Sequence, residues 1–364
     1  MKKRLISLLQ LALGIGLVSF LFFRMDNKAD LLHALRSIAR NWPCFAGAVI
    51  CFLACILVCT RRWLLILRAH DIQVSFWHAL ELYFIGQFFN AFMFGSIGGD
   101  LVKVFFVAKS VPDKRAEAVT TVFIDRFMGM LALVALIGVI LACRFNFFTR
   151  YAETRLVMLF MFGVLFATVL GLVVVFRKNV FEHSAFFRRM EDKYPIGRTI
   201  SKVYGAFHAC LTHHGLLGKL LALSVANHVI IIVAALLLGL GLNIRTIPAQ
   251  VPPPVPEGIP AEAPAEAFPP FQPFAEFANY LTVFPIVNGI AAIPATPGSL
   301  GTREYATKFL LGVPEFQVPE TRSVPLSLLL YVMTLFWSLV GGLVYLRYTL
   351  HAGKPTKSDL EALV

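Results

Sequence analysis

Charged side chains stand at three places within otherwise apolar sequence, and they are the residues best suited to chemistry. Guanidinium and ammonium groups can hold a phosphate, while carboxylates can orient those cations or bind a cationic headgroup. An unpaired charge is costly in apolar surroundings, so we expect these groups to pair or to face a polar space. The candidate binding residues are Asp100, Lys103, Asp125, Arg126, Arg303 and Glu304, together with Asn90.

Two of the charged groups follow a break rich in glycine and proline. The first break reads Gly-Ser-Ile-Gly-Gly from Gly95, and the second reads Pro-Gly-Ser-Leu-Gly from Pro297. Both residue types release the backbone from regular helix. A helix that restarts after such a break points its N–H groups toward an anion. The candidate break and hinge residues are Gly95, Gly98, Gly99, Pro294, Pro297, Gly298 and Gly301.

The third group, Asp125-Arg126, lies inside the apolar run Val122–Phe127 and allows two interpretations. In the first, Arg126 helps to hold an anionic group and Asp125 orients a neighbouring base. In the second, the two side chains belong to an ion pair near the membrane interface that fixes the register of the helix. Sequence alone leaves both open.

The elements that position these residues are predicted by composition. Of 364 residues, 58% are hydrophobic and only 15% are charged, and the mean hydropathy is +0.73. The apolar residues form continuous runs of roughly 20 residues, the length of a membrane-spanning helix. Lipid offers the backbone no hydrogen-bond partner, so such runs must be helical. We therefore predict an all-α integral membrane protein rather than a soluble domain or a β-barrel.

Six runs are long and continuous enough to be complete spans, whereas two others are broken by Gly and Pro. The broken segments are Phe76–Ile97 and Phe277–Pro294. Arg68 and Lys103 place both flanks of the first segment inside. The second lies between the acidic outer loop and a last span that must end inside, so both of its flanks are outside. We therefore expect both segments to be re-entrant and to point in opposite directions. The predicted complete spans are Leu5–Phe23, Pro43–Leu67, Ala118–Cys143, Leu156–Phe176, Leu216–Leu242 and Pro325–Leu346.

Charge indicates the orientation and the compartment. Basic stretches, including Arg61-Arg62…Arg68, are expected in the cytoplasm, which puts both termini inside a bacterial-type inner membrane. The net charge of +12 then faces anionic lipid rather than nucleic acid. We predict one polytopic domain over residues 1–350, with an external proline-rich loop at 243–276 and a cytoplasmic tail at 351–364.

The two breaks lie at corresponding places in residues 1–150 and 151–350. Their spacing and the charge pattern indicate a four-plus-four repeat of opposite orientation, a plan that recurs in transporters. The alternative is chance similarity between two glycine-rich breaks.

Together these motifs resemble the flippase-like family, which is the transmembrane region of lysylphosphatidylglycerol synthases and their stand-alone relatives. The resemblance rests on Gly98-Gly99-Asp100, on Asp125-Arg126 and on the stretch from Pro297 to Glu304. The sequence departs from the common pattern at Phe94, Lys103, Asp125 and Ser299. The resemblance implies movement of a phospholipid between leaflets. It does not imply lysyl transfer, because the stretch up to Val364 is too short for the synthase's soluble domain.

The leading hypothesis is a lipid translocase in which Lys103, Arg126 and Arg303 contact a lipid phosphate inside a basic cavity. The acidic partners Asp100, Asp125 and Glu304 would orient them or bind a cationic headgroup. One alternative is a membrane-embedded transferase with Asp125 or Glu304 as base. Another is an accessory subunit of a partner enzyme in lipid modification. The sequence holds no nucleotide-binding motif, metal-ligand cluster or catalytic-triad spacing, so we expect no cofactor and no metal.

Overall fold

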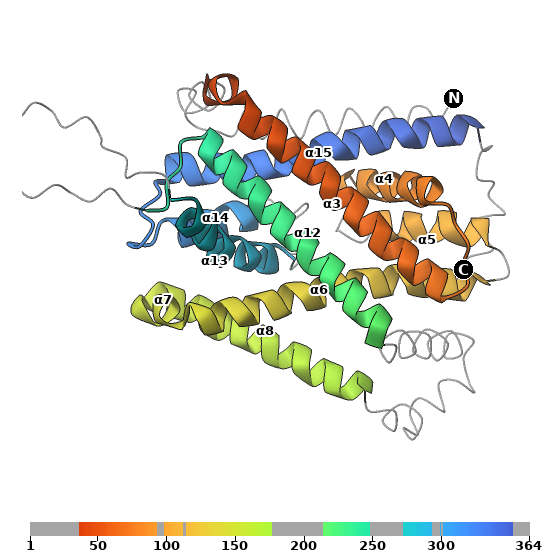
Figure 1. Cartoon of the computed structure of the whole chain (residues 1–364), viewed down its shortest axis with the longest axis horizontal. Coiled ribbons are helices and arrows are strands. Elements are labelled where there is room, and N and C mark those ends of the chain that lie inside the picture. Colours follow the sequence, from red (N-terminus) through yellow and green to blue (C-terminus); the bar gives the residue numbers. More distant parts are fainter. Residues whose placement is uncertain are drawn as a thin grey trace, which may run out of the picture.

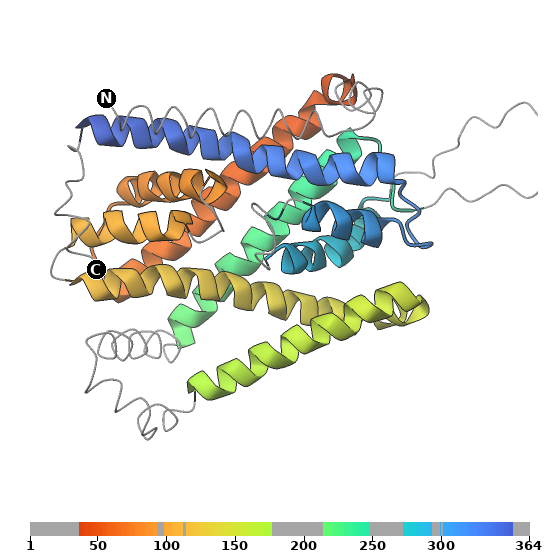
Figure 2. The same cartoon turned by 180° about the vertical axis from the view of Figure 1, so that it is seen from behind.

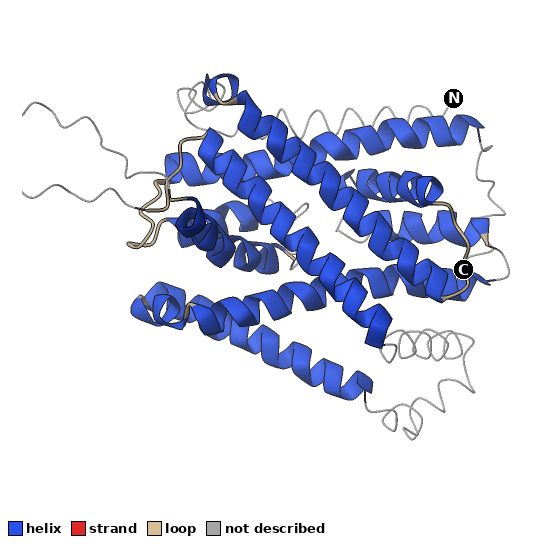
Figure 3. Ribbon diagram, viewed as in Figure 1, coloured by secondary structure: helices blue, strands red, loops and turns tan. Residues whose placement is uncertain are grey.

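The computed structural model describes residues 36–92, 98–111, 114–176, 214–247, 272–292, 299 and 301–351. Within these ranges every regular element is a helix (Figures 1 and 3), which confirms the all-α prediction. The helices are α3 Trp42–Ala69, α4 Phe76–Phe92, α5 Gly98–Ser110, α6 Arg115–Cys143, α7 Phe145–Arg150, α8 Ala152–Phe176, α12 His214–Gly241, α13 Pro273–Ala291, α14 Thr302–Leu311 and α15 Glu320–His351.

Five of these helices, α3, α6, α8, α12 and α15, are long and apolar enough to cross a membrane. They correspond to five of the six predicted complete spans, and the remaining one, Leu5–Phe23, lies outside the described residues. The 28 residues of α3 extend over about 42 Å, which exceeds the roughly 30 Å of a hydrocarbon core. The chain is therefore a multi-pass membrane protein.

Each predicted broken segment forms only the first helix of a hairpin, because the returning helices α5 and α14 lie beyond the predicted bounds at Ile97 and Pro294. The helix α4 ends at Phe92, earlier than predicted, and α5 restarts at Gly98 and packs back along it. The helix α13 ends at Ala291, and α14 packs against it in the same way. The α4–α5 hairpin lies at the end of the bundle where α6 begins, and the α13–α14 hairpin lies at the end that holds α7 (Figures 1 and 2). The end of α4 and the end of α13 therefore approach the middle of the bundle from opposite ends.

The first hairpin is closed by backbone contact between its two helices. The side-chain oxygen of Asn90 accepts a hydrogen bond of 2.9 Å from the Gly99 N–H, which satisfies one of the free donors at the start of α5. A Cβ atom on Gly99 would lie only 1.8 Å from the carbonyl oxygen of Gly86. This position therefore admits glycine alone, because the two backbones meet there.

The second hairpin is closed by a strained turn. Ser299 and Gly301 both have positive φ angles, 57° and 86°, a region that only glycine adopts without steric cost. The Ser299 hydroxyl donates a hydrogen bond to the carbonyl of Ala291, the last residue of α13. The carboxylate of Glu304 accepts one from the Gly301 N–H and so caps α14.

Two apolar clusters hold the hairpins in place. One surrounds the first hairpin and joins α3, α5 and α6 through residues such as Trp63, Phe106 and Val122. The other surrounds the second hairpin and includes Phe284 and Leu326. The long helix α15 packs against α14 and also against α4, so a single helix connects the two regions.

The predicted external loop at 243–276 is shorter than the sequence indicated. Pro273 begins α13, where its fixed φ suits the first turn of a helix. Glu276, the last residue of the predicted loop, lies in the first turn of α13, where it is buried and accepts hydrogen bonds from the backbone N–H and the hydroxyl of Thr246. Residues 248–271 and the predicted tail beyond His351 lie outside the described residues.

Candidate functional site

Four helices bring charged and polar side chains to one depth in the bundle. Arg62 and Lys103 lie about two turns before the ends of α3 and α5, while Asp125 and Ser224 lie about three turns after the starts of α6 and α12. The end of α3 and the start of α6 are tied together, because Lys114 donates to the carbonyls of His70 and Asp71. The four side chains therefore meet about 10–15 Å inside that end of the bundle.

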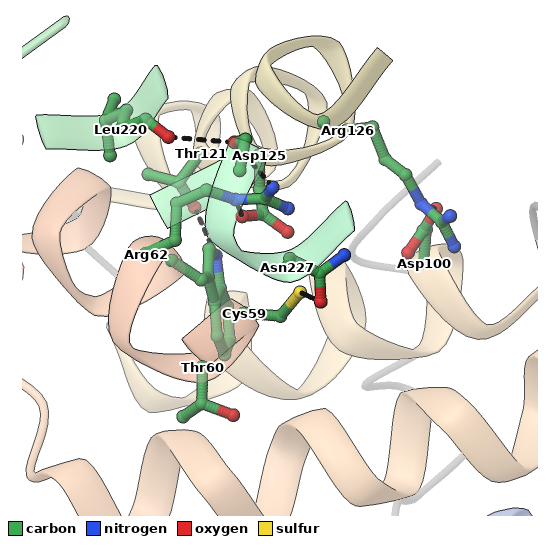
Figure 4. Close-up of polar contacts among 12 residues, drawn as sticks. Cys59, Thr60, Arg62, Asp100, Thr121, Asp125, Arg126, Leu220 and Asn227 are labelled. Carbon is green, nitrogen blue, oxygen red and sulfur yellow. Dashed lines mark hydrogen bonds and ion pairs between the residues drawn. The ribbon is translucent and has the colours of Figure 1, made fainter. Parts of the chain in front are cut away.

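Asp125 is the centre of this buried cluster. The Nε of Arg62 donates to its Oδ1 at 2.7 Å, and the Nζ of Lys103 lies 3.8 Å from its Oδ2. Nη1 of Arg62 also donates to the Ser224 hydroxyl at 2.8 Å. Figure 4 shows Arg62 and Asp125 pointing at each other between α3, α6 and α12. The carboxylate therefore joins α3, α5 and α6, and Arg62 extends the cluster to α12 through Ser224.

The ammonium group of Lys103 is further enclosed by aromatic rings. It lies 4.3 Å from the ring centre of Trp63 and 4.4 Å from that of Tyr83. Rings at this distance attract a cation through their quadrupoles. Trp63 is held in turn by a hydrogen bond from its Nε1 to the hydroxyl of Thr121. The ammonium group is therefore stabilised without water.

The buried cluster carries one more positive charge than negative. Arg62, Lys103 and Asp125 are 5%, 4% and 3% exposed. Removing such groups from water costs several kcal/mol for each ion, and good pairing geometry must offset this cost. One carboxylate is therefore shared by two basic side chains.

Arg126 points elsewhere and pairs with a different acid. Consecutive helix residues project about 100° apart, and Arg126 forms an ion pair with Asp100 of α5 rather than joining Asp125. Its side chain is 48% exposed, against 4% for Asp125. Figure 4 shows the Arg126–Asp100 pair apart from the buried cluster. Among the predicted binding residues around α5 and α6, this pair is more accessible to a ligand than Lys103 and Asp125.

Arg303 and Glu304 belong to the other hairpin, in the first turn of α14. Glu304 caps that helix and also accepts a 3.4 Å hydrogen bond from the hydroxyl of Ser327 on α15. The Nε of Arg303 is buried and has no hydrogen-bond partner. Arg303 interacts electrostatically with Glu304 and with Tyr331 of α15.

The structure thus places the predicted binding residues in two groups. Asp100, Lys103, Asp125 and Arg126 come together around α5 and α6, and Asn90 closes the hairpin beside them. Of the predicted break residues, Gly98 and Gly99 are buried in the first turn of α5, and Gly301 caps α14. Gly95, Pro294, Pro297 and Gly298 lie outside the described residues.

The main residue that the sequence analysis missed is Arg62. It was grouped with Arg61 and Arg68 as part of a cytoplasmic basic stretch, yet it lies inside α3 and is buried. Arg61 and Arg68 are exposed, as expected. A usable signal existed, because Arg62 falls within the predicted span Pro43–Leu67. An arginine inside an apolar span normally has a partner. Within the described ranges, no three His, Cys, Asp or Glu side chains gather as a metal site.

Comparison with known proteins agrees with the resemblance drawn from the motifs. A family model described as the lysylphosphatidylglycerol synthase TM region matches residues 7–251, more than half of the chain. The matched part includes the first hairpin and the buried cluster and ends before α13. No curated protein and no solved structure matches the chain.

Proposed function

The chain belongs to the lysylphosphatidylglycerol synthase TM region family, and from this membership and its two hairpins we propose that it is a lipid translocase. It moves a phospholipid or another lipid with a phosphate-bearing headgroup between the leaflets of a bacterial-type cell membrane. The basic ends of α3 and α5 are expected on the cytoplasmic side. This orientation places both termini in the cytoplasm.

The observation that carries this proposal is the pair of opposed hairpins. Each has charged side chains at the start of its second helix: Asp100 in α5, paired with Arg126 of α6, and Arg303 and Glu304 in α14. The hairpins come from opposite ends of the bundle (Figure 1). A headgroup that leaves one leaflet can therefore contact the charged residues of the far hairpin before it loses its contacts with the near hairpin. Such a relay lowers the cost of carrying a polar group through hydrocarbon.

An inverted repeat accounts for this arrangement. In the first half a long helix, a hairpin and a second long helix follow one another as α3, α4–α5 and α6. The same order returns as α12, α13–α14 and α15, with the hairpin at the opposite end. Two inverted halves give two related faces to one lipid path, a plan that suits alternating access.

The embedded-transferase alternative is weaker because both candidate bases are engaged. Asp125 contacts two cations, and Glu304 caps α14. A general base needs a free lone pair within about 3 Å of the proton that it removes. The same ion pairs and the same helix cap would also be expected in an accessory subunit, because charges that neutralise one another need no substrate. Lipid movement separates that alternative from the translocase.

The test is lipid movement in proteoliposomes made with the purified protein. The probes are headgroup-labelled anionic phospholipid, aminoacylated phospholipid and isoprenoid phosphate. We expect the intact protein to move one of these classes and an Arg126→Ala, Arg303→Ala variant to move it at least about tenfold more slowly. An Arg61→Ala, Arg68→Ala variant loses the same charge from exposed positions and should behave as the intact protein does. If the folded intact protein moves no class, the translocase proposal is wrong and the accessory role replaces it.

A further inference from the structure

In the described part of the chain, α14 and α15 carry three buried polar atoms without a hydrogen-bond partner. The Nε of Arg303 and the hydroxyls of Tyr331 and Ser323 are all buried without a hydrogen-bond partner. A buried donor left unpaired costs about 1–3 kcal/mol. Three such atoms between two packed helices are therefore expensive unless a ligand pairs with them.

The three side chains share one region. Ser323, Ser327 and Tyr331 are spaced by four residues along α15, which puts them on one face of that helix. Ser327 lies in the middle of this face and donates to Glu304 of α14, so the face is turned toward α14. Arg303 interacts electrostatically with Tyr331. Ser323 is 0% exposed and Tyr331 is 5% exposed, so both hydroxyls lie inside the protein.

The neighbouring Glu304 does not supply a hydrogen-bond acceptor for the Nε–H of Arg303. The carboxylate of Glu304 is drawn to the start of α14 by the Gly301 N–H and to α15 by the Ser327 hydroxyl. It interacts with Arg303 through space, but the Nε–H of Arg303 is left without an acceptor. The start of α14 adds the partial positive charge of a helix N-terminus. The atoms in need of partners are thus donors in a positive field, and an oxyanion fits them.

We propose that Arg303 and Tyr331 form a phosphate-binding site between α14 and α15, with Ser323 as a further hydroxyl donor. This inference rests on the proposed lipid-moving function and adds to it a second headgroup site, separate from the Arg126–Asp100 pair of the first hairpin. The ligand is a phosphate monoester or diester. Its oxygens accept from the Arg303 Nε–H and from the Tyr331 hydroxyl.

Binding by the full chain in detergent tests this site. Native mass spectrometry would record the retention of phosphatidylglycerol and, as a lipid without phosphate, of a diacylglycerol glycoside. Inorganic phosphate added as competitor separates a lipid headgroup from the free ion. The variants are Tyr331→Phe, which removes one hydroxyl and keeps the ring, and Arg303→Gln. Tyr280→Phe is the matched control, because Tyr280 also has a buried hydroxyl without a partner, on α13.

We expect Tyr331→Phe and Arg303→Gln each to weaken phosphatidylglycerol binding by about tenfold, as for loss of a hydrogen bond to a charged group. Glycolipid retention and Tyr280→Phe should not change. Binding of inorganic phosphate alone, lost in the same two variants, would support the site with free phosphate as its ligand. If both variants bind phosphatidylglycerol and phosphate as the intact protein does, the site is wrong. Failure of lipid movement with binding intact would instead count against the proposed function alone.

Discussion

The two hairpins share a plan, but their charged residues are in different situations. In the first hairpin, Lys103 and Asp100 are both paired with α6, through Asp125 and Arg126. In the second hairpin, Glu304 caps its own helix and the Nε of Arg303 has no partner. The first hairpin is therefore fixed to its neighbours by ion pairs, whereas the second keeps a donor available for a ligand.

The contacts that hold the two helices of each hairpin together also differ between the two hairpins. At the first break, α4 and α5 touch through backbone atoms at Gly86 and Gly99, where no side chain fits. At the second, Gly301 has open space around its Cβ position and adopts its positive φ without cost, whereas Ser299 is held at a φ of 57° that is strained for a residue other than glycine. Close packing resists movement, while a strained turn stores energy that a conformational change can release. We therefore expect the second hairpin to be the one that responds to a headgroup.

The largest expected difference concerns the arginines. Arg62→Ala removes the main partner of the buried Asp125 carboxylate, so we expect a loss of about 3–5 kcal/mol in unfolding free energy. Arg303→Ala removes a group that lacks a partner at Nε and should cost much less. Equilibrium unfolding of the detergent-solubilised protein in SDS would measure both, with Arg61→Ala as the exposed control. Equal losses for Arg62→Ala and Arg303→Ala would remove the distinction between the hairpins.

Glycine substitutions compare the two closures. Gly99→Ala puts a methyl group against the Gly86 carbonyl, and overpacking of this kind costs about 1–3 kcal/mol. Gly301→Ala meets no atom but must adopt φ +86°, at about 1–2 kcal/mol. Gly163→Ala on α8 has open space and a helical backbone, so it should not destabilise the protein. The same SDS unfolding applies. A Gly99→Ala variant as stable as Gly163→Ala would show that the first hairpin is not closely packed.

Removing the side-chain hydrogen bonds that span the two breaks should destabilise the protein less. Asn90→Ala removes the acceptor for the Gly99 N–H, at a cost of about 1 kcal/mol. Hydrogen exchange at the start of α5 should then accelerate about fivefold. Ser299→Ala should do the same for the end of α13, because it frees the Ala291 carbonyl. Unchanged exchange at α5 in Asn90→Ala would mean that this contact does not hold the hairpin closed.

The smallest expected effect is that of Glu304→Gln. The amide oxygen can still accept from the Gly301 N–H, so only the favourable charge at the helix start is lost, about 0.3–1 kcal/mol. Hydrogen exchange in the first turn of α14 would rise slightly, with α5 unchanged as the internal reference. A large loss of stability would indicate that Glu304 does more than cap its helix.

Much of the fold could be predicted because membrane burial leaves a simple pattern. Five continuous apolar runs became α3, α6, α8, α12 and α15, and the two Gly/Pro breaks became hairpins. Lipid requires each of these segments to satisfy its own backbone, so hydropathy and helix breakers carry most of the information. Exact ends were harder to predict, as at α4, which stops at Phe92.

The partners of the charged residues could not be predicted from sequence. Asp125 and Arg126 are neighbours in the chain but pair in different directions, with Arg62 and with Asp100. Periodicity assigns residues to faces of one helix, whereas which faces meet depends on the packing of several helices. Tyr331 was missed for a related reason, because one tyrosine in a long span gives no sign that its hydroxyl lacks a partner.

The measurement that tests the account most directly is lipid movement in proteoliposomes with each hairpin's arginine removed separately. If a headgroup passes both hairpins in turn, Arg126→Ala and Arg303→Ala should each slow movement by at least about tenfold, as expected for loss of a charged hydrogen bond. The two steps then follow one another, so the slower step sets the overall rate. The double variant should therefore move lipid at a rate close to that of the slower single variant. Full-rate movement by either folded single variant would contradict the account, because that hairpin would not lie on the path of the lipid.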